Sequence, residues 1–365
     1  MDPSKQLRRK KIFTFIIALI FGLALGAAGF VVYKQYILKT PDGLPSLISR
    51  KTPKPETTRN PLDGTEVEKS VANRHPLAII IENHPEARPQ AGLDKASIIY
   101  EAITEGGITR YLAVYGPRDA DKVGPVRSLR TFFLDWAWEY EAFLAHVGGN
   151  IDALDRIPVE SVLDLDQFRY GDRAYWREPE RGKAIEHTMY TSTPKLYQIA
   201  EKNNWDMKGN FESLHFLNSP SYQSEPGLNQ KITIDFSSPS YKVSYEYNPT
   251  TNNYLRFLAG YPHKDALTGN QLAPTNLIIQ SVERHPGLTR INEDSWTFET
   301  IGEGKAKIFY GGQEIEATWK KPDLKARTKF YDSSGEEIKF LPGQFWYEIV
   351  PPEVFEKIKI ENTQS

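Results

Sequence analysis

The longest apolar run of the chain lies near its N-terminus. Residues 12–33 are 22 consecutive residues without a charged side chain. As a helix with a rise of about 1.5 Å per residue they would span about 33 Å, enough for the roughly 30 Å hydrocarbon core of a bilayer. The pattern predicts a transmembrane helix at 12–33, preceded by a stub at 1–11. The alternatives are a cleaved signal peptide, whose apolar region is usually ~7–15 residues long, and a buried helix of a soluble protein, which the basic residues before the run disfavour.

Residues 34–73 have the pattern of a linker. Five prolines interrupt this stretch among Lys, Thr, Asp and Ser: Pro41, Pro45, Pro53, Pro55 and Pro61. Such a composition favours an extended chain that buries little apolar surface. We therefore predict a linker that separates the helix from the residues that follow.

Residues 74–220 alternate between strand and helix patterns. The apolar run at 77–81 is typical of a buried strand, and two β-rich runs at 97–103 and 108–116 flank Thr104-Glu105-Gly106-Gly107 as in a hairpin. Apolar side chains at three- and four-residue steps predict a helix at 128–140. Further strands are predicted at 142–147 and 159–165, and further helices at 150–156 and 193–203. These elements predict an α/β domain.

From residue 228 onward the pattern is mainly that of short strands. They are predicted at 231–236, 241–247, 254–258, 276–282, 295–301, 305–310, 317–319 and 345–350. Strands at this spacing suggest a sandwich or barrel-like domain over 228–358. The predicted fold class is therefore α+β, with an N-terminal transmembrane helix, a mixed α/β domain and a mainly β C-terminal domain.

Charge is distributed unevenly along the chain. Residues 1–60 hold 11 Lys and Arg against 3 Asp and Glu, and the remaining residues hold 34 against 44, so a segment of charge +8 precedes one of charge −10. By the positive-inside rule the basic stub stays in the cytoplasm and everything after residue 33 lies outside. We predict a single-pass protein of the cell membrane whose linker and folded part are extracytoplasmic.

Composition excludes several function classes. The formal net charge of −2 argues against a nucleic-acid partner. The absence of Cys excludes disulfides, Cys-ligated metals, thiol catalysis and lipid attachment through an N-terminal cysteine. The seven His are too scattered for their spacing to predict a metal site. The sequence also lacks a nucleophile elbow, a P-loop and a dinucleotide fingerprint, so no cofactor is expected.

Two charged residues interrupt the apolar faces of the predicted hairpin. With a four-residue loop at 104–107, the numbers of cross-strand partners sum to 211, which places Glu101 opposite Arg110. Buried charges are expected to be paired. The pair is therefore either a structural ion pair or the beginning of a polar site. A register shifted by one residue would place the two side chains on opposite faces.

Two arginines lie where the helix at 128–140 is expected to begin. Ser128 is the candidate N-cap, which places Arg127 and Arg130 at the first turn. A helix N-terminus prefers anions, so arginines there need compensation. They are either paired with acids of the chain, for which Glu101, Glu105, Asp119 and Asp121 are candidates, or they help bind an anion such as phosphate.

A polar loop follows the predicted strand at 77–81. Loops at the carboxyl ends of strands often hold binding sites in open α/β sheets. Arg88 and Gln90 are the best-placed side chains for binding in this loop. His84 is a candidate base there, although a lone histidine on a loop is more often simply solvated.

Several of these stretches resemble the YerB-like family of bacterial cell-envelope proteins, which is defined by two domains of unknown function. The N-terminal match runs through 79–90, 98–116, 124–131 and Phe143-Leu144-Ala145-His146-Val147-Gly148-Gly149. The C-terminal match includes Pro262-His263-Lys264-Asp265, Gly302-Glu303-Gly304-Lys305-Ala306, Thr318-Trp319 and Pro342-Gly343-Gln344-Phe345-Trp346. The resemblance implies an extracytoplasmic protein tethered to the membrane, and it implies no activity. Members of the family look like lipoproteins anchored by cysteine, whereas this chain has none, so its anchor would be the helix.

The order of features is also similar to that of the LytR-CpsA-Psr envelope phosphotransferases, which have a cytoplasmic stub, one span and an external α/β domain. Arg/Asp motifs in that family hold a polyprenyl pyrophosphate. Here Arg110, Arg127 and Arg130 precede Gly148-Gly149 in a similar order. The expected Arg-Asp pair is missing because Ser128 follows Arg127, which leaves anion binding but not catalysis as an implication.

The leading hypothesis is a membrane-anchored envelope protein that binds an anionic cell-wall component or a wall-synthesis partner. The candidate anion-binding residues are Arg88, Gln90, Glu101, Arg110, Arg127, Ser128 and Arg130. The candidate partners are a cell-wall polymer, a polyprenyl phosphate and a wall-synthesis protein. One alternative is a phosphotransferase or hydrolase acting on lipid-linked glycan, with Glu105, Asp119 and Asp121 as candidate catalytic acids. The other is a structural scaffold without a small ligand.

Overall fold

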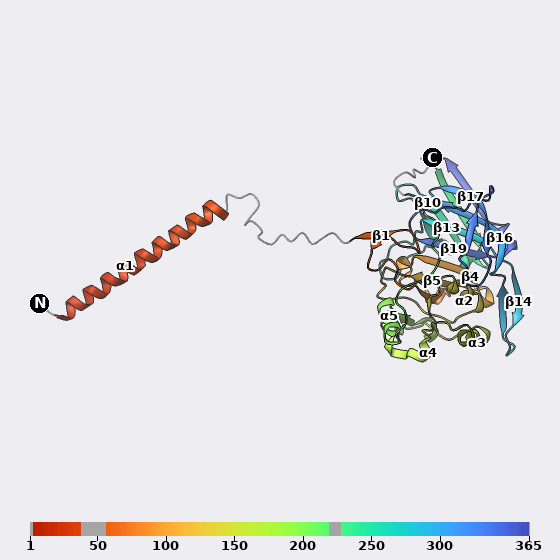
Figure 1. Cartoon of the computed structure of the whole chain (residues 1–365), viewed down its shortest axis with the longest axis horizontal. Coiled ribbons are helices and arrows are strands. Elements are labelled where there is room, and N and C mark those ends of the chain that lie inside the picture. Colours follow the sequence, from red (N-terminus) through yellow and green to blue (C-terminus); the bar gives the residue numbers. More distant parts are fainter. Residues whose placement is uncertain (1–2, 38–55, 219–227, 365) are drawn as a thin grey trace. The chain divides into compact units, whose positions relative to one another are not determined.

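The structure is a computed structural model that describes residues 3–37, 56–218 and 228–364. The chain divides into two units, Met1–Pro55 and Glu56–Ser365. We call the second unit the body. In the first unit, α1 (Pro3–Val32) continues into a short π-helix (Tyr33–Ile37) and is drawn as one continuous rod in Figure 1. Its segment 16–35 is long and apolar enough to cross a membrane, by length and composition, and none of it is buried.

Nine strands of the body form one mixed sheet. In spatial order they are β18 (Lys329–Tyr331), β17 (Gln313–Lys321), β16 (Gly302–Tyr310), β13 (Asn276–Ser281), β19 (Phe345–Val350), β4 (Ile98–Ile103), β5 (Thr109–Tyr115), β3 (Leu77–Glu82) and β6 (Phe143–Ala145). The pairs β13/β19, β19/β4 and β3/β6 are parallel and the others are antiparallel. Every residue of β3, β4, β5 and β19 is buried, as expected for strands covered on both faces.

Smaller sheets and short helices complete the body. A five-stranded sheet has the order β12 (Tyr261–Pro262), β11 (Asn253–Leu258), β10 (Lys242–Asn248), β9 (Leu228–Asp235) and β20 (Lys359–Gln364). Three two-stranded sheets pair β1 (Thr57–Arg59) with β2 (Glu66–Glu68), β7 (Tyr175–Arg177) with β8 (Met189–Thr191) and β14 (Arg284–Leu288) with β15 (Asp294–Phe298). The α-helices are α2 (Thr131–Trp138), α3 (Ile151–Glu160), α4 (Gln167–Tyr170), α5 (Thr193–Lys202) and α6 (Pro352–Phe355).

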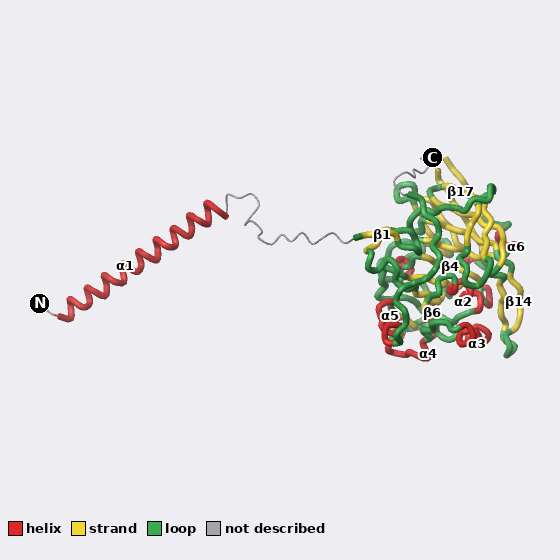
Figure 2. The backbone as a smooth tube through the Cα atoms, viewed as in Figure 1, coloured by secondary structure: helices red, strands yellow, loops and turns green. Residues whose placement is uncertain are grey.

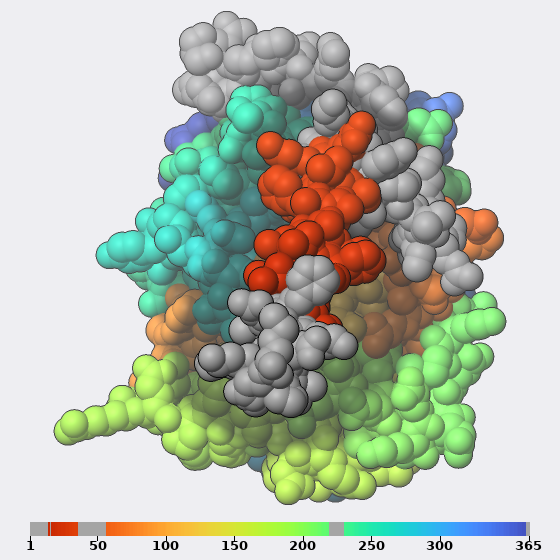
Figure 3. All heavy atoms as spheres, turned by 90° about the vertical axis from the view of Figure 1, so that its left-hand side faces the viewer, coloured from red at the N-terminus to blue at the C-terminus, as the bar shows by residue number. Residues whose placement is uncertain are grey.

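Three helices, α3, α4 and α5, lie at one end of the body (Figures 1 and 2). Figure 1 shows the strands β10 and β17 at the opposite end, and β14 beside the helices. In the space-filling view of Figure 3, the segment that contains α4 and α5 (yellow-green) forms the lower part of the face, and strands of the five-stranded sheet (blue-green) lie above it. The body is therefore a mixture of helix and sheet whose later part consists mostly of strands.

The nine-stranded sheet joins the two segments, 74–220 and 228–358, that the sequence predicts as separate domains. Strand β19 lies between β13 and β4, so residues near the C-terminus pair with residues of the 74–220 segment. The C-terminal strands are divided between this sheet and the five-stranded one. The domain boundaries 74–220 and 228–358 stay a prediction.

Two predicted elements differ from the structure. Residues 56–73, assigned above to the linker, belong to the body, because Leu62 and Asp63 are buried and β1 pairs with β2. Residues 38–55 of that linker lie outside the described residues. No strand forms at 159–165, because residues 159 and 160 belong to α3, which Asn150 caps and which ends at Ser161 in the left-handed region.

Candidate functional site

Glu82 and Arg110 meet at the edge of the large sheet where β3 ends. They are cross-strand partners in the antiparallel pair β3/β5, and both are buried. Strand β6 pairs with β3 only along residues 77–79. Beyond Ile79, the segment 125–127 forms backbone hydrogen bonds with β3 instead. The Glu82 N–H donates to the Pro125 carbonyl at 2.8 Å, and the Arg127 N–H donates to the Ile80 carbonyl at 2.9 Å. The sheet therefore brings Arg110 and Arg127 to the same carboxylate.

Three arginines gather here, and we call Arg110, Arg127 and Arg130 the arginine cluster. Arg127 Nε lies 2.5 Å from a carboxylate oxygen of Glu82. Arg130 donates through Nε to both Glu105 carboxylate oxygens, at 2.8 and 2.9 Å. Arg110 donates through Nη1 to the Ser128 carbonyl at 2.8 Å. Three guanidinium groups thus face two carboxylates.

The electrostatics of the cluster follow from burial and from this imbalance. Burial, followed by the charge of Arg130, lowers the pKa of Arg110 to about 10. Burial acts to raise the pKa of Glu82 and of Glu105, but the neighbouring arginines outweigh it and both values fall below the ordinary one. Arg110 Nε is buried and has no hydrogen-bond partner among the described residues. The cluster therefore retains an unused donor and an excess of positive charge.

The predicted register of the hairpin is wrong by one residue. The loop contains five residues, because the Thr104 N–H bonds to the Ile108 carbonyl at 2.6 Å, and Ile103 pairs with Thr109. Gly106 and Gly107 supply the positive φ angles that this turn needs. The shift moves Glu101 opposite Tyr111 and away from Arg110, so the predicted Glu101–Arg110 pair does not exist.

Glu101 instead belongs to a buried ionic network on the other face. Its carboxylate is in close contact with Arg256 Nη2 and accepts from Thr109 Oγ1 at 2.6 Å. Glu348 shares the same guanidinium at 3.7 Å and is close to Tyr245, whose hydroxyl donates to it. This network is not among the predictions from the sequence, although a signal for it is present. Arg256 interrupts the inward-facing row of an alternating strand, between Tyr254 and Leu258.

Ser128 is not the N-cap of α2. The helix begins at Thr131 with Arg130 as its cap residue, and no side chain caps it. Residues before it are extended because their backbones bond to neighbouring segments, as in the Leu129 N–H to Gly148 carbonyl bond of 2.9 Å. Ser128 contributes its carbonyl to Arg110.

Arg88 and Gln90 organise the loop after β3. Arg88 donates to the side chain of Asn83 at 3.0 Å and to its carbonyl at 2.9 Å. Gln90 donates to the carbonyl of Glu82 at 3.0 Å and bonds to the ring of His263 at 2.9 Å. These partners hold the loop against the end of the sheet. Arg88 also lies 5.2 Å from the ring of Tyr241.

The three candidate catalytic acids are dispersed. Glu105 lies in the arginine cluster through its pair with Arg130. Asp119 is instead paired with Arg74 at 2.7 Å and bonded by Thr193 at 3.1 Å. Asp121 is exposed on the surface. The structure therefore brings only one of these acids next to the arginines.

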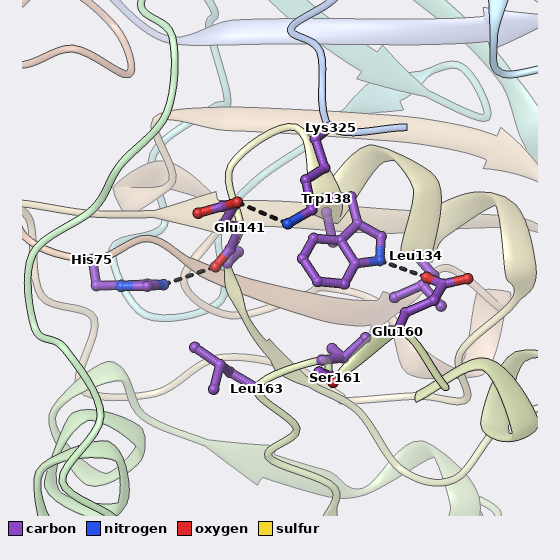
Figure 4. Close-up of a pocket in the computed structure, with 11 residues that line it drawn as sticks. His75, Leu134, Trp138, Glu141, Glu160, Ser161, Leu163 and Lys325 are labelled. Carbon is purple, nitrogen blue, oxygen red and sulfur yellow. Dashed lines mark hydrogen bonds and ion pairs between the residues drawn. The ribbon is translucent and has the colours of Figure 1, made fainter. Parts of the chain in front are cut away.

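A cavity of about 270 Å³ lies near the other end of α2 (Figure 4). Its apolar wall includes Leu134 and Leu163, and Trp138 donates to Glu160 at 2.6 Å. Lys325 lies 3.1 Å from Glu141, whose carbonyl bonds to the ring of His75 at 2.8 Å. Two carboxylates and one lysine make this cavity a poorer place for an anion than the arginine cluster.

Two family models match the chain over most of the body. The N-terminal domain of a protein of unknown function, DUF3048, matches residues 62–206, and the DUF3048 C-terminal domain matches residues 232–347. This chain belongs to the DUF3048 family. The match confirms the family resemblance deduced from the sequence.

Relatives of this DUF3048 protein agree with the fold. The chain is 29% identical over 301 residues to "Putative lipoprotein YerB" of Bacillus subtilis (strain 168), covering 81% of this chain and 88% of that protein. The crystal structure of YerB from Bacillus subtilis superimposes with a TM-score of 0.73 at 27% identity, covering 83% of this chain and 99% of that chain. An apolar N-terminal helix and a relative named as a lipoprotein fit a membrane-anchored or extracytoplasmic protein.

Proposed function

We propose that this DUF3048 protein is anchored in the cell membrane by α1, with its N-terminus in the cytoplasm, and binds a phosphate-bearing envelope component through the arginine cluster. The observation that carries the proposal is the set of three guanidinium groups on two carboxylates, with the buried Nε of Arg110 unpartnered among the described residues. A bound anion would pair with that excess charge.

The chemistry of the cluster suits phosphate. Guanidinium groups donate two parallel hydrogen bonds to phosphate or carboxylate oxygens, and such charge-assisted bonds are short and strong. The side chains of Arg127 and Arg130 remain 27% and 15% exposed, so a ligand can reach them from solvent. Arg110 below them supplies charge from a buried position. The basic stub and the acidic remainder of the chain support an extracytoplasmic body.

The phosphate group has two plausible sources, a lipid headgroup and a wall polymer. Binding should therefore be measured with the full chain in nanodiscs against three probes: inorganic phosphate, polyprenyl phosphate in the bilayer and soluble phosphate-containing wall polymer. Binding of the lipid alone would identify the headgroup, and binding of the polymer alone would identify the wall. Either result supports the proposal.

The deciding variant is Arg127→Ala combined with Arg130→Ala. We expect it to weaken binding by at least about tenfold, because each charge-assisted hydrogen bond contributes roughly 1.5–3 kcal/mol. The matched control is Arg290→Ala, which removes an arginine from an exposed ion pair with Asp155. Near-UV circular dichroism checks that each variant is folded. Unchanged binding by the folded double variant would contradict the proposal and favour a scaffold whose arginines only pair with internal acids.

A further inference from the structure

The fold brings His187 next to His84 and Glu86, which lie about a hundred residues earlier in the chain. His84 and Glu86 lie in the loop after β3, and His187 ends the short 3-10 turn Ile185–His187. One ligand atom from each of the three residues lies within 4.8 Å of the other two. The rings of His84 and His187 are stacked, with centroids 4.6 Å apart and planes 2° from parallel. Spacing in the sequence did not reveal this group.

We propose that His84, Glu86 and His187 bind a divalent transition-metal ion, with zinc as the best match. Two imidazoles and one carboxylate are a typical three-residue zinc set, which leaves a fourth position for water or an anion. Imidazole ligands favour zinc, copper, iron and nickel over magnesium or calcium. The proposal does not rest on the proposed anion-binding function.

His187 gives an observation independent of the clustering. The residue is only 6% exposed, yet its Nδ1 is buried without a hydrogen-bond partner among the described residues. Its other nitrogen, Nε2, lies 3.8 Å from the carboxylate of Glu86, and Nδ1 lies 3.8 Å from that of Glu82. A metal-binding histidine usually donates its second ring N–H to a carboxylate. Glu82 is placed to take that role when Nε2 binds the ion.

The surrounding charge favours a divalent cation. The charged groups that act on His187 are the carboxylates of Glu82 and Glu186 and the guanidinium of Arg127, and the Glu86 carboxylate lies 3.8 Å from its Nε2. Glu82 is shared with Arg110 and Arg127 of the arginine cluster, so Glu86 and Glu186 are the carboxylates that belong to this site alone. Arg127 is itself paired with Glu82. A divalent ion would offset the negative charge of the Glu86 and Glu186 carboxylates.

Binding requires the ring of His84 to turn out of its stack with His187, because two parallel rings cannot direct their in-plane lone pairs at one ion. Ligands of a tetrahedral zinc site lie about 3.3 Å apart, given metal–ligand bonds of about 2.0–2.1 Å. His84 is half-buried and the Glu86 side chain is 52% exposed, so both can turn toward His187. His84 Nδ1 accepts a long hydrogen bond of 3.3 Å from the Glu86 N–H, which an ion at Nδ1 would replace.

The test is a titration of the full chain, purified without a histidine tag, with Zn²⁺ alone by isothermal calorimetry. We expect one equivalent to bind and the melting temperature to rise with the zinc concentration. Cobalt(II) should give the visible absorption of a tetrahedral site. His84→Asn and Glu86→Gln, both on an accessible loop, should each weaken binding at least about tenfold without unfolding the body, and His187→Asn should abolish it.

The matched control is His285→Asn. His285 also lies 2.9 Å from a carboxylate, that of Glu299, but on an exposed hairpin away from this group. This variant should bind zinc like the wild type. Absence of zinc binding in the wild type, or equal binding by the wild type and the His84→Asn and Glu86→Gln variants, would overturn the proposal. The same variants should bind inorganic phosphate as tightly as the wild type does while losing zinc. That result would show that the metal site and the arginine cluster are separate sites.

Discussion

At the residue scale, two buried carboxylates compete for one guanidinium. Glu101 accepts from Asn83 and Thr109 as well as from Arg256, so its negative charge is well solvated by the protein. Glu348 lies farther from Arg256 and close to Tyr245. Burial, followed by the nearby charge of Glu101, raises the pKa of Glu348 well above its ordinary value. Burial and the neighbouring carboxylate therefore favour the neutral form of Glu348.

This assignment predicts different costs for two similar substitutions. Glu348→Gln removes a charge that burial already disfavours and keeps an acceptor for Tyr245, so it should change the free energy of unfolding by less than about 1 kcal/mol. Glu101→Gln leaves Arg256 buried without its anion and should cost about 3–5 kcal/mol. Urea unfolding of both variants measures the difference. Equal costs would show that the two carboxylates share the charge.

The arginine cluster predicts how stability depends on pH. The pKa values of Glu82 and Glu105 are lowered in the folded chain, so their contribution is complete above the unfolded value of 4.5 and is lost as the pH falls through the lower folded values. The unfolding free energy should therefore decrease in acid below about pH 4.5. Glu105→Gln should make this decrease shallower, as measured by urea unfolding between pH 7 and pH 3. An unchanged slope would contradict the ion pair with Arg130.

At the element scale, the sequence predicts where strands lie better than how they pair. The run at 77–81 and the alternation at 254–258 identify β3 and β11 because burial imposes those patterns directly. The register of β4 and β5 depends instead on whether Ile108 belongs to the loop, and one residue decides which face Glu101 occupies. Helix α2 begins at Thr131 and not at the predicted residue 128 for a similar reason. Backbone hydrogen bonds from Arg127 and Leu129 to other segments outweigh the local capping signal.

A close approach of two elements gives a prediction at this scale. Gly343, just before β19, has a φ of +149°, and a Cβ there would meet Thr275 Oγ1 at 2.1 Å. Gly343→Ala should destabilise the body by about 1–3 kcal/mol through overpacking. The matched control is Gly335→Ala. Gly335 also has a positive φ, but a Cβ there would meet no atom within 4 Å, so the substitution should cost only about 1 kcal/mol. Thermal unfolding compares the two, and equal losses would mean that the contact with Thr275 has no effect.

At the scale of the whole molecule, the two family domains share a sheet and a buried ionic contact. Strand β19 pairs with β4 along five residues, and Arg327 donates to the buried carboxylate of Glu139 at 2.8 Å. No pattern in the sequence predicted this sharing, because parallel pairing between distant strands leaves no local signal. The candidate metal-binding residues were missed for the same reason, since His84 and His187 become neighbours only through the fold.

The shared sheet predicts that the body unfolds as one unit. Calorimetry of the full chain should show a single transition for the body. A fragment of residues 56–218 would expose the edge of β4 and lose the partner of Glu139, so it should show no cooperative unfolding and little near-UV circular dichroism. A fragment that melts cooperatively would contradict this account and make the N-terminal family domain an independent folding unit.

The predicted membrane topology is tested on intact protoplasts. Protease added outside should digest the body, whereas a tag placed before Met1 should survive until the membrane is permeabilised. A body that resists the protease until permeabilisation would contradict the orientation proposed for α1.

The most direct test of the central proposal is native mass spectrometry of the full chain extracted from its own host. The account predicts that the wild type and the Arg290→Ala control retain a phosphate-bearing lipid or glycan. It also predicts that the variant with Arg127→Ala and Arg130→Ala, equally folded, has lost this ligand. A wild type without any such ligand, or the same ligand at the same occupancy on the double variant, would contradict the arginine cluster as an anion-binding site.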